Sequence, residues 1–195
     1  LDVGRRAQVR ADTLRLVKNS GVATLMVTHD PEEAMFMADR IHIMNAGRIV
    51  QGGSPTELYF EPADAFVTEF FGPVNRFHGA VSGGAVETPL GRFTVSGFAD
   101  DTPVDVLIRV EGLRVAGYAD APEGEPDDNA GRQPASVTLE VETARPLGRS
   151  SYVVFKLAGG GRAIGRIPGM FLPATGERIE IAVNPRQAHV FSHHT

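Results

Sequence analysis

The side chains best suited to chemistry lie around His29, a histidine that is followed at once by residues typical of a helix start. An apolar, β-branched run at Val22–Thr28 precedes it and predicts a strand buried on both faces. Asp30, Pro31 and Glu33 supply an N-cap carboxylate, a proline at the first helical position and a capping glutamate, so we expect a helix to begin at Pro31. Strand, histidine and helix then follow in that order.

The place of His29 between the two elements indicates what its imidazole can do. In parallel α/β sheets, ligands bind outside the carboxyl ends of the strands, and a neutral imidazole there can donate one N–H to a bound phosphate. A histidine that ends a strand can equally bond to backbone. The placement alone leaves both interpretations open.

Other parts of a phosphate-transfer site are absent from the 195 residues. ATP hydrolysis needs a glycine-rich loop with its Lys and an Asp-Glu pair that holds Mg²⁺ and polarises water. Residues 160–167, GGRAIGRI, imitate the loop spacing, but Arg replaces Lys and Ile replaces Ser/Thr within an alternating strand pattern. Residues 82–84, SGG, are expected to form a turn. No metal site is predicted, because the remaining candidates lack ligand spacing and are isolated or terminal: His78, His189, His193 and His194.

Composition narrows the class of protein. The chain has no cysteine, which excludes disulfides and thiolate metal sites and fits a reducing compartment. The net charge of −5 argues against nucleic acid as the main partner. No apolar run approaches the roughly 20 residues that span a bilayer, and no signal peptide is visible, so membrane association is expected only through a partner protein.

The elements of the first part are predicted from capping and periodicity. We expect a helix over residues 3–19, a hairpin formed by residues 41–44 and 48–51, a short helix after the capping box at Ser54, and a helix over residues 63–71. Phe66, Phe70 and Phe71 are expected on one packed side of the last helix.

From Pro73 onward, short alternating strands with glycine turns are typical of one small β-barrel with additions or of two related barrels. Residues 119–134, which are acidic and rich in proline, predict a mobile surface loop. The expected strands are Arg76–Val81, Ala85–Glu87, Arg92–Val95, Asp105–Val110, Leu113–Ala116, Val137–Ala144, Tyr152–Leu157, Arg162–Ile167, Arg178–Val183 and His189–Phe191.

Three motifs in order, VTHDPEEA at 27–34, ADRI at 38–41 and GGSPTELY at 52–59, closely resemble the carboxyl half of the nucleotide-binding subunit of an ABC-type importer. The resemblance runs from Leu1 to about Phe71. It implies that Leu1 and Asp2 end the family's D-loop and contribute to the ATP and dimer interface. It also implies that His29 is the catalytic switch histidine, which contacts the γ-phosphate of ATP across the dimer.

The second part resembles the TOBE domain found at the carboxyl end of such ATPases. The similar pieces are residues 75–81, TPLGRF at 88–93, IRVEGL at 108–113, ARPLG at 144–148 and HVF at 189–191. Relatives commonly have Arg-Pro-Glu where this chain has Arg109-Val110-Glu111, which removes a proline and affects only local turn geometry.

Together the resemblances imply an α/β remnant of a P-loop-type ABC ATPase domain at residues 1–72, followed by an all-β OB-like (TOBE) barrel at 73–195. They imply the carboxyl-terminal portion of an importer's ATP-binding subunit that uses ATP and Mg²⁺ when intact but is inactive as this piece. The expected partners are a second copy, membrane permease subunits and, indirectly, a periplasmic or extracellular solute-binding protein. The expected location is cytoplasmic, on the inner face of the membrane.

Two points stay open at this level. The sequence does not specify the transported solute, because specificity in such systems lies in the permease and the external binding protein. Similarity of the TPLGRF region at 88–93 favours ferric iron, with polyamine, sulfate and molybdate next. The alternative function is a stand-alone regulatory, dimerisation or small-ion-binding barrel without catalysis. An OB-like nucleic-acid binder is disfavoured by the acidic charge and the lack of tryptophan.

Overall fold

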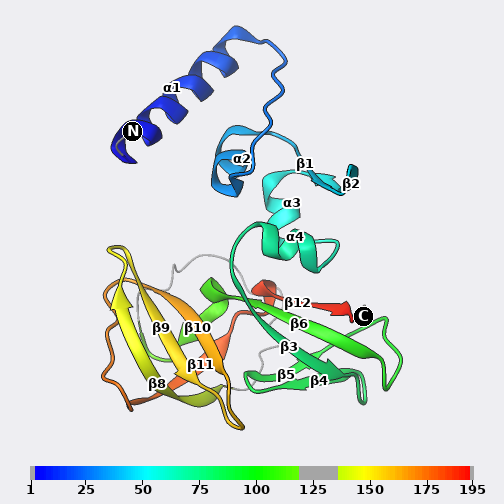
Figure 1. Ribbon diagram of the computed structural model, residues 1–195, viewed down its shortest axis with the longest axis vertical. Helices are drawn as coiled ribbons and strands as arrows, with labels where there is room; N and C mark the ends of the chain where they lie inside the picture. The colour runs from blue at the N-terminus through cyan, green and yellow to red at the C-terminus, as the bar shows by residue number, and fades with distance from the viewer. Residues whose placement is uncertain (1–2, 119–135, 194–195) are drawn as a thin grey trace. The chain divides into compact units, whose positions relative to one another are not determined.

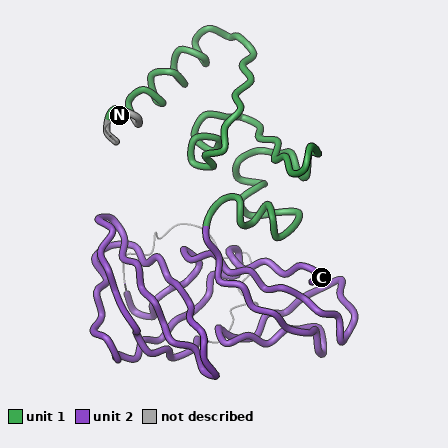
Figure 2. The backbone as a smooth tube through the Cα atoms, in the orientation of Figure 1, with its two compact units in different colours: residues 1–72 green, residues 73–195 purple. Residues whose placement is uncertain are grey.

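The computed structural model describes residues 3–118 and 136–193, and the chain forms two compact units, residues 1–72 and 73–195 (Figure 2). The boundary between the units follows Gly72 and coincides with the change from helical to alternating sequence patterns. The expected acidic loop at 119–134 lies outside the described residues.

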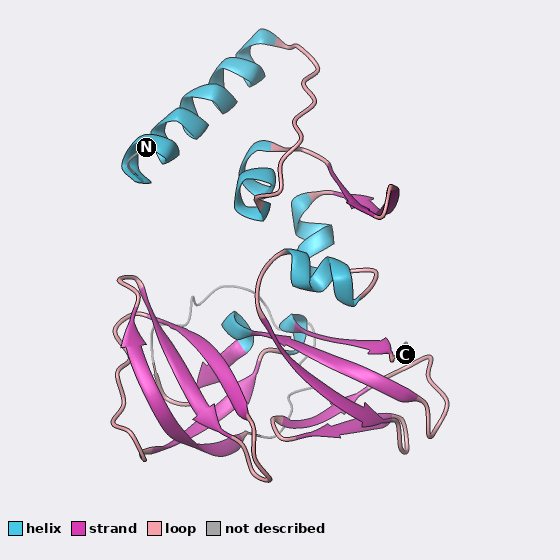
Figure 3. Cartoon of the chain, viewed as in Figure 1, coloured by secondary structure: helices cyan, strands magenta, loops and turns pink. Residues whose placement is uncertain are grey.

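The first unit consists of four helices and one hairpin (Figures 1 and 3). A turn with φ values of 47° at Ala46 and 77° at Gly47 joins the two antiparallel strands of the hairpin. The predicted helices and hairpin are therefore confirmed. Their bounds are α1 (Val3–Ser20), α2 (Pro31–Met37), β1 (Ile41–Asn45), β2 (Arg48–Gly53), α3 (Pro55–Phe60) and α4 (Ala65–Phe70).

A small apolar cluster holds α2 to α4 and the hairpin together. Its buried members are Ala34, Ile41, Ile43, Leu58 and Val67. Phe70 and Phe71 pack against this cluster, but Phe66 is 37% exposed, so the prediction of three packed phenylalanines is wrong for the first of them. In the short helix α4, the ring of Phe66 points away from the side of the helix on which Val67 is buried.

The predicted buried strand at Val22–Thr28 is not a strand in the structure. The segment is extended but unpaired, and Leu25 and Val27 are 91% and 92% exposed. A doubly buried strand needs strands at both edges and cover on both faces, whereas β1 and β2 of this unit pair with each other. Among the described residues of the first unit, the pairing is antiparallel, so the P-loop-type α/β character stays a prediction.

The second unit is built from short antiparallel strands, and all ten predicted strands are confirmed within a few residues at their ends (Figure 1). The bounds are β3 (Val74–Ala80), β4 (Ala85–Thr88), β5 (Gly91–Thr94), β6 (Pro103–Arg109), β7 (Leu113–Val115), β8 (Val137–Pro146), β9 (Ser150–Lys156), β10 (Arg162–Pro168), β11 (Arg178–Val183) and β12 (Ala188–Ser192).

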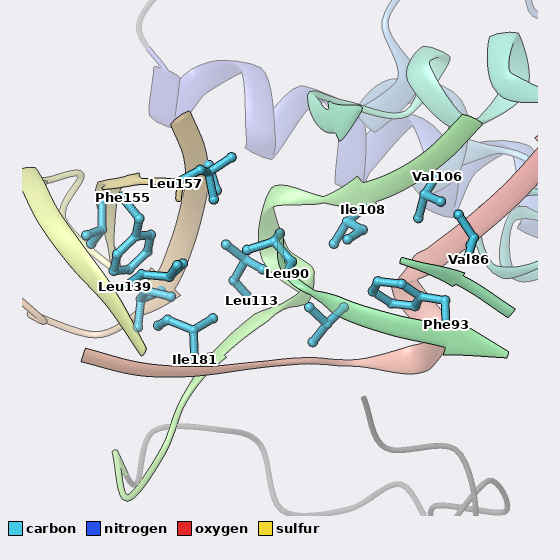
Figure 4. Packing of buried hydrophobic residues seen from close by; sticks show 14 of the residues in the cluster. Val86, Leu90, Phe93, Val106, Ile108, Leu113, Leu139, Phe155, Leu157 and Ile181 are labelled. Carbon is cyan, nitrogen blue, oxygen red and sulfur yellow. The ribbon is translucent and has the colours of Figure 1, made fainter. Parts of the chain in front are cut away.

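These strands form three sheets around one core. The orders are β10-β9-β8-β11-β7 in a five-stranded sheet, β12-β6-β3 in a three-stranded sheet, and the hairpin β4-β5. The five-stranded sheet curls until its edge strands β10 and β7 contact each other. Side chains from all three sheets meet in a single apolar cluster, to which Phe155, Leu113 and Ile108 belong (Figure 4). One barrel-like unit with additions therefore describes the fold better than two barrels.

Asn75 joins the three-stranded sheet to the five-stranded sheet. Its Oδ1 accepts a hydrogen bond from the backbone N–H of Ile164 at 2.7 Å, and its Nδ2 donates to the carbonyl of Ile164 at 2.9 Å. The same Nδ2 lies 3.4 Å from the carbonyl oxygen of Ile108. Asn75 is only 6% exposed, so its amide replaces strand pairing between β3 and β10 at this point.

Replacing Asn75 by Ala is expected to lower the free energy of unfolding of the second unit by about 2–3 kcal/mol, because it leaves buried backbone groups of Ile164 without partners. Urea unfolding followed by circular dichroism measures the loss. Asn184→Ala is the matched control, since among the described residues this half-buried amide accepts a single hydrogen bond, from Arg186 N–H at 3.1 Å. Equal losses in the two variants would contradict the role given to Asn75.

Candidate functional site

His29 lies at the junction that the sequence predicts, immediately before α2. Asp30 is the N-cap residue, and its carboxylate accepts hydrogen bonds from the backbone N–H groups of Glu32 at 2.9 Å and Glu33 at 3.1 Å. Pro31 occupies the first turn, where its missing N–H has no helical partner to lose. The helix start is thus formed by local chemistry and does not depend on the unpaired segment before it.

A second set of bonds holds the backbone on both sides of His29. The hydroxyl of Thr28 donates to Oε2 of Glu33 at 2.6 Å and accepts from the N–H of Asp30 at 3.1 Å. The His29 side chain itself is exposed. The arrangement presents an imidazole from a fixed turn, where it can donate one N–H to an anionic group that binds there.

The other two residues assigned to the nucleotide interface, Leu1 and Asp2, lie outside the described residues. Their assignment to an ATP and dimer interface stays a prediction.

Two segments resemble nucleotide-binding motifs in spacing, residues 82–84 and residues 160–167. As expected, the first is a turn and the second is part of a turn and a strand. Gly83 and Gly84 have φ values of 56° and 70° in the turn before β4. Arg162 begins β10, and its guanidinium pairs with both carboxylate oxygens of Glu142 at 2.6 Å. Glu142 is held by that pair, and its pKa is lowered chiefly by the hydrogen bonds from Arg162.

Sequence reasoning missed a cluster in the second unit. Treating His78 and His193 as isolated is wrong, because the Nδ1 atoms of both rings lie within hydrogen-bond distance of Oδ1 of Asp105, at 2.5 Å and 3.0 Å. Burial acts to raise the pKa of Asp105, but the hydrogen bonds from His193 and His78 outweigh it and hold this pKa below its usual value. The sequence signal for this cluster was the carboxylate of Asp105 inside the apolar run of β6. Nothing in the sequence indicated which residues would bond to that carboxylate.

His189 behaves differently from these two histidines. It pairs with Leu107 in the register of β12 and β6 and is largely buried. Burial, together with the nearby Arg109 guanidinium, lowers the pKa of His189 to about 4, so its ring is neutral at pH 7. A neutral, buried ring beside a fixed cation is a packing element of the sheet.

No helix in residues 3–118 and 136–193 is long and apolar enough to span a membrane.

Comparison with protein families gives a match in the second unit. Residues 106–191, which run from β6 to β12, match the family described as the TOBE domain. The similarity covers most of the second unit.

Sequence relatives extend the similarity to nearly the whole chain. The chain is 34% identical over 98% of its length to the sn-glycerol-3-phosphate import ATP-binding protein UgpC 3 of Agrobacterium fabrum, of which it covers 52%. It is 30% identical over 98% of its length to the Fe(3+) ions import ATP-binding protein FbpC of Pseudomonas fluorescens, with 52% of that protein covered. FbpC of Streptomyces avermitilis is 40% identical over 64% of this chain and 35% of its own length.

The chain is thus similar, over nearly its whole length, to proteins named as ATP-binding proteins of importers. It spans about half the length of the curated relatives that it matches over nearly its whole length. A solved structure of the cytoplasmic molybdate-binding protein ModG aligns with 61% of this chain and 96% of its own, at a TM-score of 0.43 and 12% identity, a likeness too low to support an argument.

Proposed function

We propose that this chain is the carboxyl-terminal portion of the ATP-binding subunit of an ABC importer. The observation that carries the proposal is the similarity over 98% of the chain to subunits named for import and ATP binding, together with the TOBE match at residues 106–191. In the intact subunit, ATP and Mg²⁺ would be held mainly by upstream residues. His29 would reach the γ-phosphate of a nucleotide bound by a second copy, and Leu1 and Asp2 would lie at the same interface.

The local geometry of His29 supports this assignment. Its ring is exposed, while Thr28, Asp30 and Glu33 fix the backbone on either side through hydrogen bonds of 2.6–3.1 Å. A group that must meet charge developing on a transferring phosphoryl group gains from being positioned in advance. An exposed histidine in a fixed turn meets that requirement better than one that bonds to its own backbone.

The partners follow from the same proposal. A second copy would complete the nucleotide site. ATP hydrolysis by the pair would drive the conformational change of the permease subunits, and a solute-binding protein outside the membrane would take part indirectly. The subunit would then be cytoplasmic and bound peripherally to the membrane through the permease. For the solute we favour the ferric-iron class; the 40% identical relative is named for Fe(3+) ions, and the 34% identical relative is named for sn-glycerol-3-phosphate.

The 195-residue chain by itself is expected to hydrolyse no ATP above background, because it lacks the phosphate-cradling loop and the Mg²⁺ carboxylates that supply most of the stabilisation of a transferring phosphoryl group. Phosphate release by the purified chain measures this. Steady turnover that His29→Ala abolishes would contradict both the prediction and the proposed division of the site.

A further inference from the structure

The three-stranded sheet of the second unit brings two imidazoles and a carboxylate together on one face. His78 on β3 lies directly opposite Asp105 on the central strand β6. His193 follows β12 on the other side of β6, and its backbone N–H donates to the carbonyl of Pro103 at 3.0 Å. Val104 and Val106 alternate with Asp105 and pack in the core, so the cluster lies on the opposite face of the sheet.

The donor atoms of the cluster converge on one point. The Nδ1 atoms of His78 and His193 lie 2.5 Å and 3.0 Å from the same Oδ1 of Asp105. One ligand atom from each of the three residues lies within 4.8 Å of the other two. The rings stand nearly edge to face, with centroids 5.0 Å apart and an interplanar angle of 75°. Two strands, β3 and β6, and the residue that follows β12 therefore supply one compact donor set.

The three side chains of the cluster differ in how much of each is exposed to solvent. The side chain of Asp105 is 9% exposed, that of His193 is 34% exposed and that of His78 is 64% exposed. The carboxylate is thus fixed in the sheet, while the His78 ring borders solvent. A ligand that enters between the rings meets a negative charge at the bottom and keeps one side open to water.

The donor set matches a particular class of cation. Two imidazole nitrogens and one carboxylate oxygen suit divalent transition metals such as Zn²⁺, whereas Ca²⁺ and Mg²⁺ prefer oxygen ligands alone. In a tetrahedral zinc site, ligand atoms about 2.1 Å from the metal lie about 3.4 Å from one another. Each Nδ1 would have to move away from Oδ1 of Asp105 by less than about 1 Å to reach that separation.

We propose that His78, Asp105 and His193 bind a divalent transition-metal cation of the Zn²⁺ class, with water in the remaining position. In the bound state each neutral imidazole carries its proton on Nε2, so both Nδ1 atoms are free to coordinate the cation, which ties β3 to the end of β12 across β6. This site is separate from His29 and does not depend on the proposed ATPase role.

The test is a titration of the metal-free 195-residue chain with Co²⁺ followed by visible absorption, and with Zn²⁺ followed by calorimetry. The expected result is one saturable site with the absorption of four-coordinate Co²⁺, displaced by Zn²⁺. His78→Gln is the decisive variant, because an exposed ring can be replaced without affecting the fold, and it should weaken Zn²⁺ binding by at least about tenfold. His193→Gln should do the same.

His42→Gln is the matched control, since His42 is an exposed strand histidine of the first unit. The control should bind Zn²⁺ as the unaltered chain does. The proposal is overturned if the chain shows no saturable binding, in which case the cluster only hydrogen-bonds the strands together. It is equally overturned if His78→Gln and His193→Gln, checked as folded by circular dichroism, bind Zn²⁺ with unchanged affinity.

Discussion

Replacing His29 by Ala in an intact subunit that contains this chain is expected to lower kcat for ATP hydrolysis by about 100-fold or more and to change KM by less than about twofold. The loss of one preorganised donor to developing charge has effects of this size. Because the contact would strengthen in the transition state, the loss should appear in turnover and not in binding. Steady-state ATPase assays and nucleotide titration of the same preparation separate the two quantities.

His42→Ala serves as the control for His29→Ala. Both imidazoles are exposed and lie in the first unit, but His42 is the second residue of β1 and does not belong to the turn that starts α2. The His42→Ala variant should leave kcat and KM unchanged. A rise in KM with kcat intact in His29→Ala would mean that the ring makes only a ground-state contact, and the switch role would have to be abandoned.

Replacing Phe155 by Ala is expected to lower the free energy of unfolding of the second unit by about 3–5 kcal/mol, a large part of the stability of an ordinary domain. Phe155 is fully buried in the central cluster (Figure 4). Its Cε2 atom would lie 3.3 Å from a Cβ placed at Gly165 on the neighbouring strand β10, so the ring fills the space that this glycine leaves. Removing the ring leaves a cavity that the surrounding strands cannot close.

Tyr152→Ala tests whether that loss comes from burial. Tyr152 is an aromatic residue of the same strand, β9, but it is 36% exposed. Its replacement should cost less than about 1 kcal/mol. Because the two units can unfold separately, the amides of β9 and β10 should be followed by hydrogen exchange or nuclear magnetic resonance. Similar costs at the two positions would contradict the packing described for Phe155.

The strands of the second unit could be predicted because the pattern that defines them is local. Alternation of the kind seen at Val104, Val106 and Ile108 requires only that one face be apolar. Their order in the sheets could not be predicted, since pairing such as β6 between β3 and β12 depends on which apolar faces meet in three dimensions. The failure at residues 22–28 has the same origin, because a run of apolar residues predicts an extended conformation but not a partner.

The helix start beside His29 was predictable for a related reason. Asp30 and Pro31 act within the first turn as expected. Glu33 differs, because its carboxylate accepts from the Thr28 hydroxyl, and the N–H of Asp30 donates to Thr28 instead of to Glu33. The cluster of His78, Asp105 and His193 was not predictable, because its members are up to 115 residues apart and meet only through the register of β3, β6 and β12. The histidine at position 193 lies beyond the last strand, where the sequence shows no periodicity.

The exposed segment at residues 22–28 has a consequence for how this chain behaves in solution. Its sequence, VATLMVT, has high β-propensity, no charge, no proline and no glycine. A stretch of about seven such residues, if exposed and unpaired, can template intermolecular β-structure with identical copies of itself. Leu25 and Val27 are almost fully exposed, so the segment presents apolar side chains to a second copy. The residues with the strongest strand pattern in the first unit are therefore where aggregation of the concentrated chain is expected to begin.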